Sequence, residues 1–409
     1  MNAELVAPKA KQSSIWGQKP FVLLLLTSLF LNIGNQVYQL AMPLLMYEMT
    51  RSAVMMSNMR IAEYLPNLLL GLVVGVLVDR VNKKRWIMHM IFWQILMLLV
   101  YVALVQRDVH VYFLYYLIGF LLMSFNYGYF NAQVSLTKLL LPREHLIAAN
   151  AKLSQAETLI TILGPVLTGV IFLLARVSDG FLITAGTYAL CLLLLLPLPI
   201  PHQPAPPAEK GAFVRELKEG WQAFRSNRLL PLLTGFVICL NATMSMVSTT
   251  TVFFAKDDLQ LSSSMLAWVF AASGLGGLFG SWLTQRYRAK WGIGRLFGIS
   301  ALINAAAYFG FYLCKNVPSL AIALLIQGAA IAVYSVCTYT LRHELSPDAY
   351  IGRITGITGT LFRTVMPIST AVGAWMVVHW GAPSVFAAAA VVNVLLFGGL
   401  VKTALWKTR

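Results

Sequence analysis

Long apolar runs separated by short polar breaks follow one another along the whole chain. Backbone groups in hydrocarbon must bond within their own segment, so each run of about 20 apolar residues predicts a membrane-spanning helix. The runs predict six spans in the first half, at residues 21–47, 54–78, 86–105, 109–136, 148–175 and 181–198. Six more are predicted in the second half, at residues 229–255, 264–284, 296–313, 319–341, 354–378 and 382–404.

This pattern predicts an all-α membrane protein with twelve transmembrane helices in two pseudo-symmetric six-helix bundles. The expected units are a tail at 1–20, a bundle at 21–198, a linker at 199–228, a bundle at 229–404 and a tail at 405–409. In the linker, a proline-rich stretch precedes apolar residues that recur at helical spacing, namely Phe213, Leu217, Trp221 and Phe224. That spacing predicts an amphipathic surface helix, which we interpret as a tether.

Composition and charge agree with a membrane protein. Hydrophobic residues make up 58% of the chain and charged residues only 11%, and the mean hydropathy is +0.71. The net charge of +16 lies mostly on one side. If the amino terminus is cytoplasmic, the outer loops hold few cations, which are Arg51, Arg107, Arg176, Lys256 and Lys315. The positive-inside rule then predicts a protein of the inner (plasma) membrane with both termini in the cytoplasm. Because the positive charge is explained by this orientation, nucleic acid is not an expected partner.

Several chemistries lack the residues that they need. The four cysteines lie inside predicted spans without metal-ligand spacing, at Cys191, Cys239, Cys314 and Cys337. The six histidines are scattered, and the chain has no phosphate-binding Walker loop. We therefore expect no metal, no cofactor, no direct use of ATP and no enzymatic activity.

The two halves resemble each other, as the internal repeats of transporter folds do. Gly71 and Gly75 correspond to Gly276 and Gly280. In the same register Asn35 corresponds to Asn241, and Glu157 corresponds to Arg363. The second copy lacks the acidic turn that ends the second span of the first half.

That turn contains Gly75, Asp79, Arg80, Lys83 and Lys84. With twelve spans and a central linker, it resembles the loop motif of the major facilitator superfamily, and the likeness extends over nearly the whole chain. The resemblance implies that Asp79 contacts the start of the eleventh span near Arg353 and holds the cytoplasmic side closed. The alternative is that the basic residues of the turn only fix the topology.

Two further segments add to the resemblance. Gly164, Pro165 and Gly169 look like the family's antiporter motif, although Ile160 and Thr168 stand where glycines are commoner. The linker run from Phe213 to Arg228 looks most like the macrolide and siderophore exporter branch, as does the stretch from Pro347 through Gly352 and Arg353 to Pro367. The resemblance therefore implies export, and the incomplete antiporter motif leaves uptake by symport open.

Four ionisable residues lie deep inside predicted spans, at Arg60, Glu63, Glu157 and Arg363. Charges at the centre of a span cost about 2.5–3.5 kcal/mol, so each needs a partner or water. Arg60 and Glu63 are three residues apart and share a helix face, and the family fold would bring Arg363 near Glu63. We predict a pair or triad that loosens in one state, because a carboxylate that loses its cation takes up a proton. Glu63 ranks first and Glu157 second, while an ion pair that only docks the halves is the alternative.

Polar side chains also occupy the spans that line the cavity in this family, which are the first, fourth, seventh and tenth. They are Asn32, Gln36, Gln39, Asn126, Tyr129, Gln133, Asn241, Ser245, Ser248, Gln327, Tyr334 and Thr338. Neutral hydrogen-bonding groups mixed with aromatic and methionine side chains favour a bulky amphipathic ligand. The alternative for about half of them is hydrogen bonding between helices.

The leading hypothesis is a monomeric, proton-driven exporter of a macrolide-like drug or a siderophore, working by alternating access. Its expected partners are a small-molecule substrate, protons and membrane lipids. A lipid or lysolipid translocator and a proton symporter for uptake are alternatives within transport. A non-transporting membrane scaffold or sensor is the alternative of another class.

Overall fold

Long helices form the whole framework of the protein. The computed structural model describes residues 15–174, 176–198, 212–347 and 350–408, and at some positions inside α2, α5, α7 and α9 it describes the backbone only. A short 3₁₀ turn, η1 (Ile15–Gly17), precedes the first bundle. That bundle contains α1 (Lys19–Thr50), α2 (Ala53–Arg80), α3 (Lys83–Gln106), α4 (Tyr112–Leu140), α5 (Arg143–Leu174) and α6 (Asp179–Leu195).

A short helix, α7 (Ala212–Ser226), leads into the second bundle. That bundle contains α8 (Leu229–Asp257), α9 (Ser263–Trp291), α10 (Ile293–Tyr312), α11 (Val317–Leu345), α12 (Ile351–Trp380) and α13 (Ala382–Val401), followed by the 3₁₀ turn η3 (Ala404–Lys407). A helix is thus present at each of the twelve predicted spans, and α7 occupies the position of the predicted amphipathic helix. The proline-rich part of the linker lies outside the described residues.

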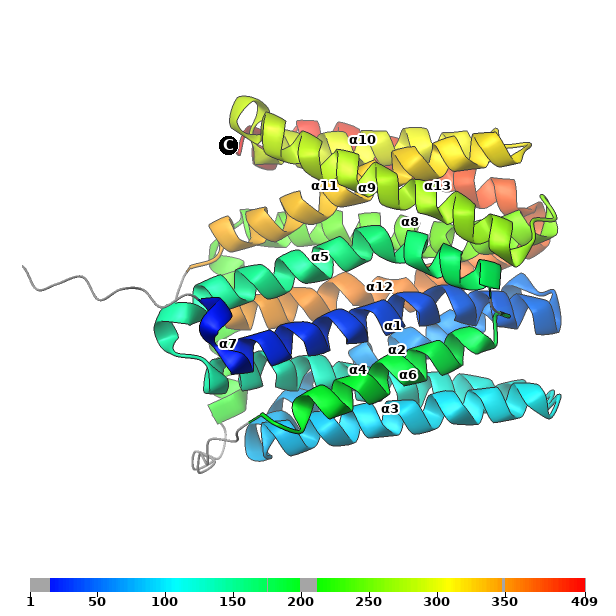
Figure 1. Ribbon diagram of the computed structural model, residues 1–409. Coiled ribbons are helices and arrows are strands. Elements are labelled where there is room, and N and C mark those ends of the chain that lie inside the picture. The colour runs from blue at the N-terminus through cyan, green and yellow to red at the C-terminus, as the bar shows by residue number, and fades with distance from the viewer. Residues whose placement is uncertain (1–14, 175, 199–211, 348–349, 409) are drawn as a thin grey trace, which may run out of the picture.

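Both ends of the described chain lie at one end of the bundle together with α7, at the left of Figure 1. We call this end the terminal face and the opposite end the distal face. Nine helices of the described part are long and apolar enough to cross a membrane, and α6 is a shorter apolar helix. Which side of the membrane the terminal face occupies stays a prediction from the charge pattern.

The helix boundaries differ from the predicted spans where polar residues continue a helix beyond the apolar run. Helix α9 extends to Trp291, past the expected end at residue 284, through the polar stretch 285–290. Helix α5 similarly begins at Arg143 rather than at residue 148. Turn residues set other ends. The Ser52 hydroxyl accepts a bond from the backbone N–H of Met55, and Asn316 forms a reciprocal capping box with Ser319.

The two bundles meet along two pairs of helices. Helix α2 packs against α12, and α5 packs against α9, so each contact joins the first half to the second. Within the second half, α9 and α11 approach each other closely at glycines. A Cβ atom on Gly276 would overlap the backbone carbonyl of Leu325, and one on Gly328 would overlap the carbonyl of Ser273. Small residues therefore allow the backbone contact between these two helices.

Polar contacts join the two halves at the distal face. The Tyr47 hydroxyl of α1 donates to the Asp257 carboxylate at the end of α8 over 3.0 Å. The Ser263 hydroxyl at the start of α9 donates to Glu48 of α1 over 2.9 Å, and the Lys256 ammonium donates to Ser263 over 2.7 Å. These contacts tie the distal ends of α1, α8 and α9 together in this conformation.

The glycine contact gives a stability prediction. Gly276→Ala forces α9 and α11 apart and should destabilise the protein by about 1–3 kcal/mol, the usual cost of overpacking. Gly235→Ala is the matched control, because nothing lies within 4 Å of its Cβ position and alanine is favoured in helices. The thermal midpoint in detergent should fall for Gly276→Ala and hold or rise for Gly235→Ala. Equal midpoints for the two variants would contradict the close contact.

Candidate functional site

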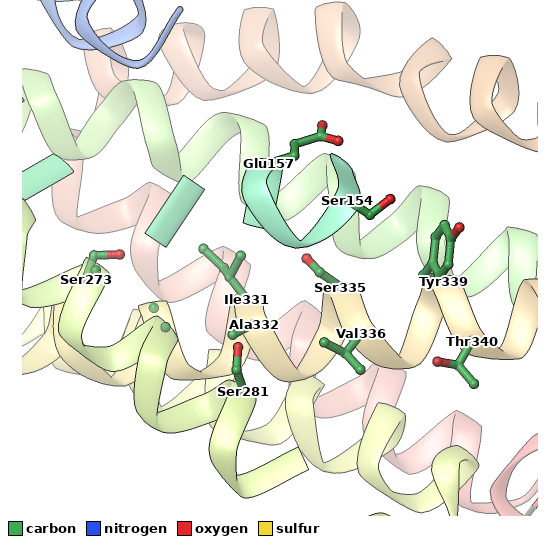
Figure 2. A pocket seen from close by; sticks show the side chains of 13 residues that line it. Ser154, Glu157, Ser273, Ser281, Ile331, Ala332, Ser335, Val336, Tyr339 and Thr340 are labelled. Atoms are coloured by element: carbon green, nitrogen blue, oxygen red, sulfur yellow. The ribbon is translucent and has the colours of Figure 1, made fainter. Parts of the chain in front are cut away.

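A cavity lies between the two halves of the protein. It encloses about 410 Å³ between α5 of the first half and α9 and α11 of the second half. Figure 2 shows Ser154 and Glu157 of α5 on one side, with Ser273 and Ser281 of α9 and Ser335, Tyr339 and Thr340 of α11 around the rest. Ser335, Tyr339 and Thr340 lie toward the end of α11 at the terminal face, so we call this hollow the inner cavity.

A second cavity of about 260 Å³ lies beside the first, between α8, α9, α11 and α12 of the second half and Tyr64 of α2. The two share Ser273 and Ile331 as lining residues, and we call the second one the central cavity. Its wall includes four of the predicted cavity residues, together with an aromatic and methionine surface. The four are Asn241, Ser245, Ser248 and Gln327, and the surface comprises Tyr64, Met244, Phe270 and Met366.

Three of the predicted polar residues of the second half, Asn241, Ser245 and Tyr334, form bonds between helices. The Asn241 amide donates to the Phe362 carbonyl over 2.9 Å and accepts from the Tyr334 hydroxyl over 2.8 Å. The hydroxyls of Ser245 and Ser369 lie 2.6 Å apart. Thr338 is buried in α11. These bonds hold the polar wall of the central cavity in one orientation.

Among the predicted polar residues of the first half, Asn126 joins helices. The Asn126 amide donates to Asn35 over 3.0 Å and to Gln94 over 3.3 Å. Tyr188 donates to the same Asn35 oxygen over 2.7 Å, and Asn32 bonds back to the Ser28 carbonyl within α1. The interhelical alternative therefore describes Asn126 well in this conformation.

The other first-half candidates lie apart from the two cavities. Tyr129 and Gln133 are buried in α4, and the Gln36 side chain packs against Gly164 of α5. The backbone carbonyl of Gln39 accepts a bond from Arg60 over 2.6 Å. In the described part of the chain, none of the first-half residues predicted to contact substrate lines either cavity. Their contact with substrate stays a prediction.

A buried ion pair lies in α2. Arg60 donates to one Glu63 oxygen over 2.8 Å, and the Tyr38 hydroxyl of α1 donates to the other over 2.7 Å. Glu63 is only 4% exposed. Both carboxylate oxygens are thus bonded in this conformation. Sequence reasoning missed Tyr38, whose partner is on another helix.

Arg363 joins the two halves by a contact that the sequence analysis did not expect. Its guanidinium in α12 donates to the Asn67 side chain of α2 over 2.7 Å. Asn67 lies one turn beyond Glu63 on α2, and the described salt bridges include none between Arg363 and Glu63. The predicted triad is therefore not formed in this conformation. The sequence signal that could have indicated this contact was the Asn67 amide, which lies four residues after Glu63 on the same helix face.

Glu157 lies on the wall of the inner cavity. Its carboxylate points away from Ile331 and Ser335 of α11 (Figure 2). Arg363 is near enough to interact electrostatically with Glu157. A carboxylate of the first half and a guanidinium of the second half therefore act on each other between the two bundles.

The predicted loop motif connects the ends of three helices at the terminal face. Gly75 lies within α2, and the side chains of Asp79 and Arg80 are outside the described part. At the start of α3, the Lys84 ammonium donates to the carbonyls of Leu196 and Leu198 over 2.7 and 2.8 Å. Lys84 thereby satisfies carbonyl groups at the end of α6. Lys83 is the first residue of α3.

Arg353, the expected partner of Asp79, contacts the linker helix. Its guanidinium donates to Glu219 of α7 over 2.6 Å, and Gly220 lies directly against its side chain. The expected contact with Asp79 involves a side chain outside the described part and stays a prediction. In the antiporter motif, Gly164 packs on Gln36 and Gly169 is buried in α5, whereas the Pro165 side chain is not described.

In the described part of the chain, twelve long helices lie in two halves with polar cavities between them, which is a membrane transporter architecture. The family model described as Major Facilitator Superfamily matches residues 24–292 and residues 232–409. The chain belongs to this superfamily, and the expected all-α fold is confirmed.

Individual proteins are similar to this chain in sequence or in fold. An enterobactin exporter from Escherichia coli O81 (strain ED1a) is 27% identical over 230 residues, which cover 56% of this chain and 54% of that protein. The chain thus matches about half the length of this curated relative. The solved nucleoside transporter NupG aligns with a TM-score of 0.73 at 13% identity, covering 95% of this chain and 100% of that one. A bacterial homologue of the iron transporter ferroportin, solved in an inward-facing state, aligns with a TM-score of 0.71 at 14% identity, covering 96% and 100%.

The ion pair in α2 gives a stability prediction. Arg60→Met leaves the buried Glu63 carboxylate without its cation and should cost roughly 3–5 kcal/mol. Adding Glu63→Gln removes the uncompensated charge, so the double variant should recover much of the lost stability. Arg176→Met, at an exposed position, is the control for losing one cation. Thermal midpoints in detergent measure all four proteins, and a double variant no more stable than Arg60→Met would contradict the pairing.

Proposed function

We propose that this protein is a proton-coupled exporter of a bulky amphipathic small molecule, a macrolide-like drug or a siderophore, that works by alternating access. The observation that carries the proposal is the pair of adjoining cavities between the two halves, with volumes of about 410 and 260 Å³. A hollow between the halves is where a transporter of this superfamily needs its substrate site.

The lining of the cavities supports the substrate class. Serine, threonine and amide groups alternate with Met244, Phe270 and Tyr64, which suits a ligand with both polar and apolar surfaces. Methionine adapts its shape to different ligands. Among the described lining residues Glu157 is the one ionisable carboxylate, and none is Lys or Arg. A strongly anionic ligand would therefore lack a cation in the wall of either cavity.

A siderophore is the more specific candidate. It is supported by the 27% identity to an enterobactin exporter and by the resemblance of the linker and the stretch 347–367 to exporters of this kind. Because the match covers about half of that relative, a macrolide-like drug remains a candidate on equal chemical grounds. Both are large molecules with mixed polar and apolar surfaces.

Alternating access is supported by the difference between the two faces. The distal face is tied by the Tyr47 to Asp257 and Ser263 to Glu48 bonds, while the inner cavity lies toward the terminal face. Export requires a second state in which these distal bonds break and the cavity opens on that side. Each bond is a single contact near the helix ends, which a change in the angle between the halves can break.

Proton coupling is the part of the proposal that rests on Glu63. In this conformation Arg60 and Tyr38 bond both of its oxygens. A movement of α1 against α2 would remove Tyr38, and a movement that draws Arg60 away would leave an unpaired buried carboxylate that binds a proton. Glu157 is the second candidate, because Arg363 acts on it from the other half.

The coupling prediction uses inverted membrane vesicles with an established proton gradient. Addition of a transported macrolide or siderophore should release protons through the parent protein, and Glu63→Gln should abolish that release because a glutamine cannot carry a proton. Glu344→Gln is the matched control, since Glu344 forms an exposed ion pair with Arg288 on the terminal face. Proton release by Glu63→Gln at the parent rate would refute the role of Glu63, and loss in Glu157→Gln instead would assign the proton to Glu157.

A further inference from the structure

A third hollow lies on the terminal face, away from the two cavities between the halves. It encloses about 370 Å³ and is lined by the end of α9, the start of α10 and η3, through Ala289, Lys290, Trp291, Gly292, Arg295 and Lys407. Three different segments each contribute one cation to its wall, and no lining residue is acidic. We call this hollow the basic pocket.

The C-terminal segment that carries Lys407 is packed directly on α10. The backbone N–H of Gly294 donates to the Thr408 carbonyl over 3.1 Å. A Cβ atom on Gly294 would overlap the Leu405 carbonyl, and Leu405 itself is fully buried. The wall formed by η3 is therefore held against α10 by backbone contact, which places Lys407 beside the cations of α9 and α10.

The three cations have no counter-charge within the described part of the protein. No described salt bridge includes Lys290, Arg295 or Lys407. By contrast, Arg288, two residues before Lys290, pairs with Glu344 over 2.6 Å. Three converging like charges repel one another unless an anion lies among them. The pocket therefore has the electrostatics of an anion site.

The position of the pocket indicates the kind of anion. Trp282 and Trp291 of α9 are exposed, and exposed tryptophans mark the headgroup level of a membrane protein. The positive end of the α10 dipole faces this region, and its first turn contains no acidic residue. Lys and Arg bind phosphate oxygens through charge-assisted hydrogen bonds.

We propose that the basic pocket binds a phosphate group, carried by the headgroup of an anionic phospholipid or by a soluble phosphate. Lys290, Arg295 and Lys407 supply the positive charge, and Trp291 forms the side of the pocket at the membrane interface. This site is separate from the transport cavities. The proposal is independent of the exported substrate and of proton coupling.

The test compares the purified full chain with a variant that carries Lys290→Gln, Arg295→Gln and Lys407→Gln. A control variant carries Lys138→Gln, Lys152→Gln and Arg225→Gln, which removes the same charge from exposed cations near the terminal face. Native mass spectrometry counts bound phosphatidylglycerol and phosphatidylethanolamine of equal chain length. Thermal midpoints are measured in titrations with phosphatidylglycerol and with inorganic phosphate.

The parent and the control variant should retain phosphatidylglycerol in preference to phosphatidylethanolamine. The site variant should bind phosphatidylglycerol about a hundredfold more weakly, since each of the three lost cations contributes a similar share of the binding free energy at a membrane surface. Protection by inorganic phosphate that is lost only in the site variant would support the same site with a soluble ligand. If neither probe distinguishes the site variant from the control variant, the proposal is wrong. None of these outcomes depends on transport, so a failure of the proposed transport function would not change them.

Discussion

Every polar group that this chain places inside the membrane needs a partner within the protein or water in a cavity, because hydrocarbon offers neither. The rest of the structure depends on this constraint. It forces the backbone into helices, and it decides which polar side chains are used to hold those helices together. Glu63 is bonded by Arg60 and Tyr38, and Asn35 accepts bonds from Asn126 and Tyr188. Polar groups that remain at the surface between the halves are the ones available to a ligand.

The two halves meet this constraint differently. In the first half, the Asn126 amide donates to Asn35 and Gln94 on other helices. In the second half, Asn241 is bonded by Tyr334 and Phe362 and still lines the central cavity. The inner cavity likewise takes most of its polar wall from α9 and α11. Both copies of the repeat thus have an amide at this position, Asn35 in the first half and Asn241 in the second. The polar surface of the cavities, however, belongs mainly to the second half.

Hydropathy predicted the twelve spans because the energy of placing a helix in hydrocarbon depends on local composition. The Arg60 and Glu63 pair was likewise predictable, since residues three apart on a helix are neighbours. Tyr38 and Asn67 were not, because their partners lie on other helices and only the packing of α1, α2 and α12 brings them together. The cavity residues Ser273, Ser281 and Ser335 were not predicted either, because they lie among glycines and alanines and small residues suit helix packing equally well. The end of α9 was also misplaced, because polar residues can continue a helix once it leaves the membrane.

The central claim is that the two halves move about the cavities so that only one face is open at a time. Spin-label distances test it directly, with one pair of labels at distal residues Arg107 and Lys315 and another at Lys138 and Arg286 near the terminal face. All four positions are exposed, and each pair spans the two halves. Lowering the pH with substrate present should lengthen the distal distance and shorten the terminal one in the same population. Distances that stay fixed, or that lengthen together at both faces, would contradict alternating access.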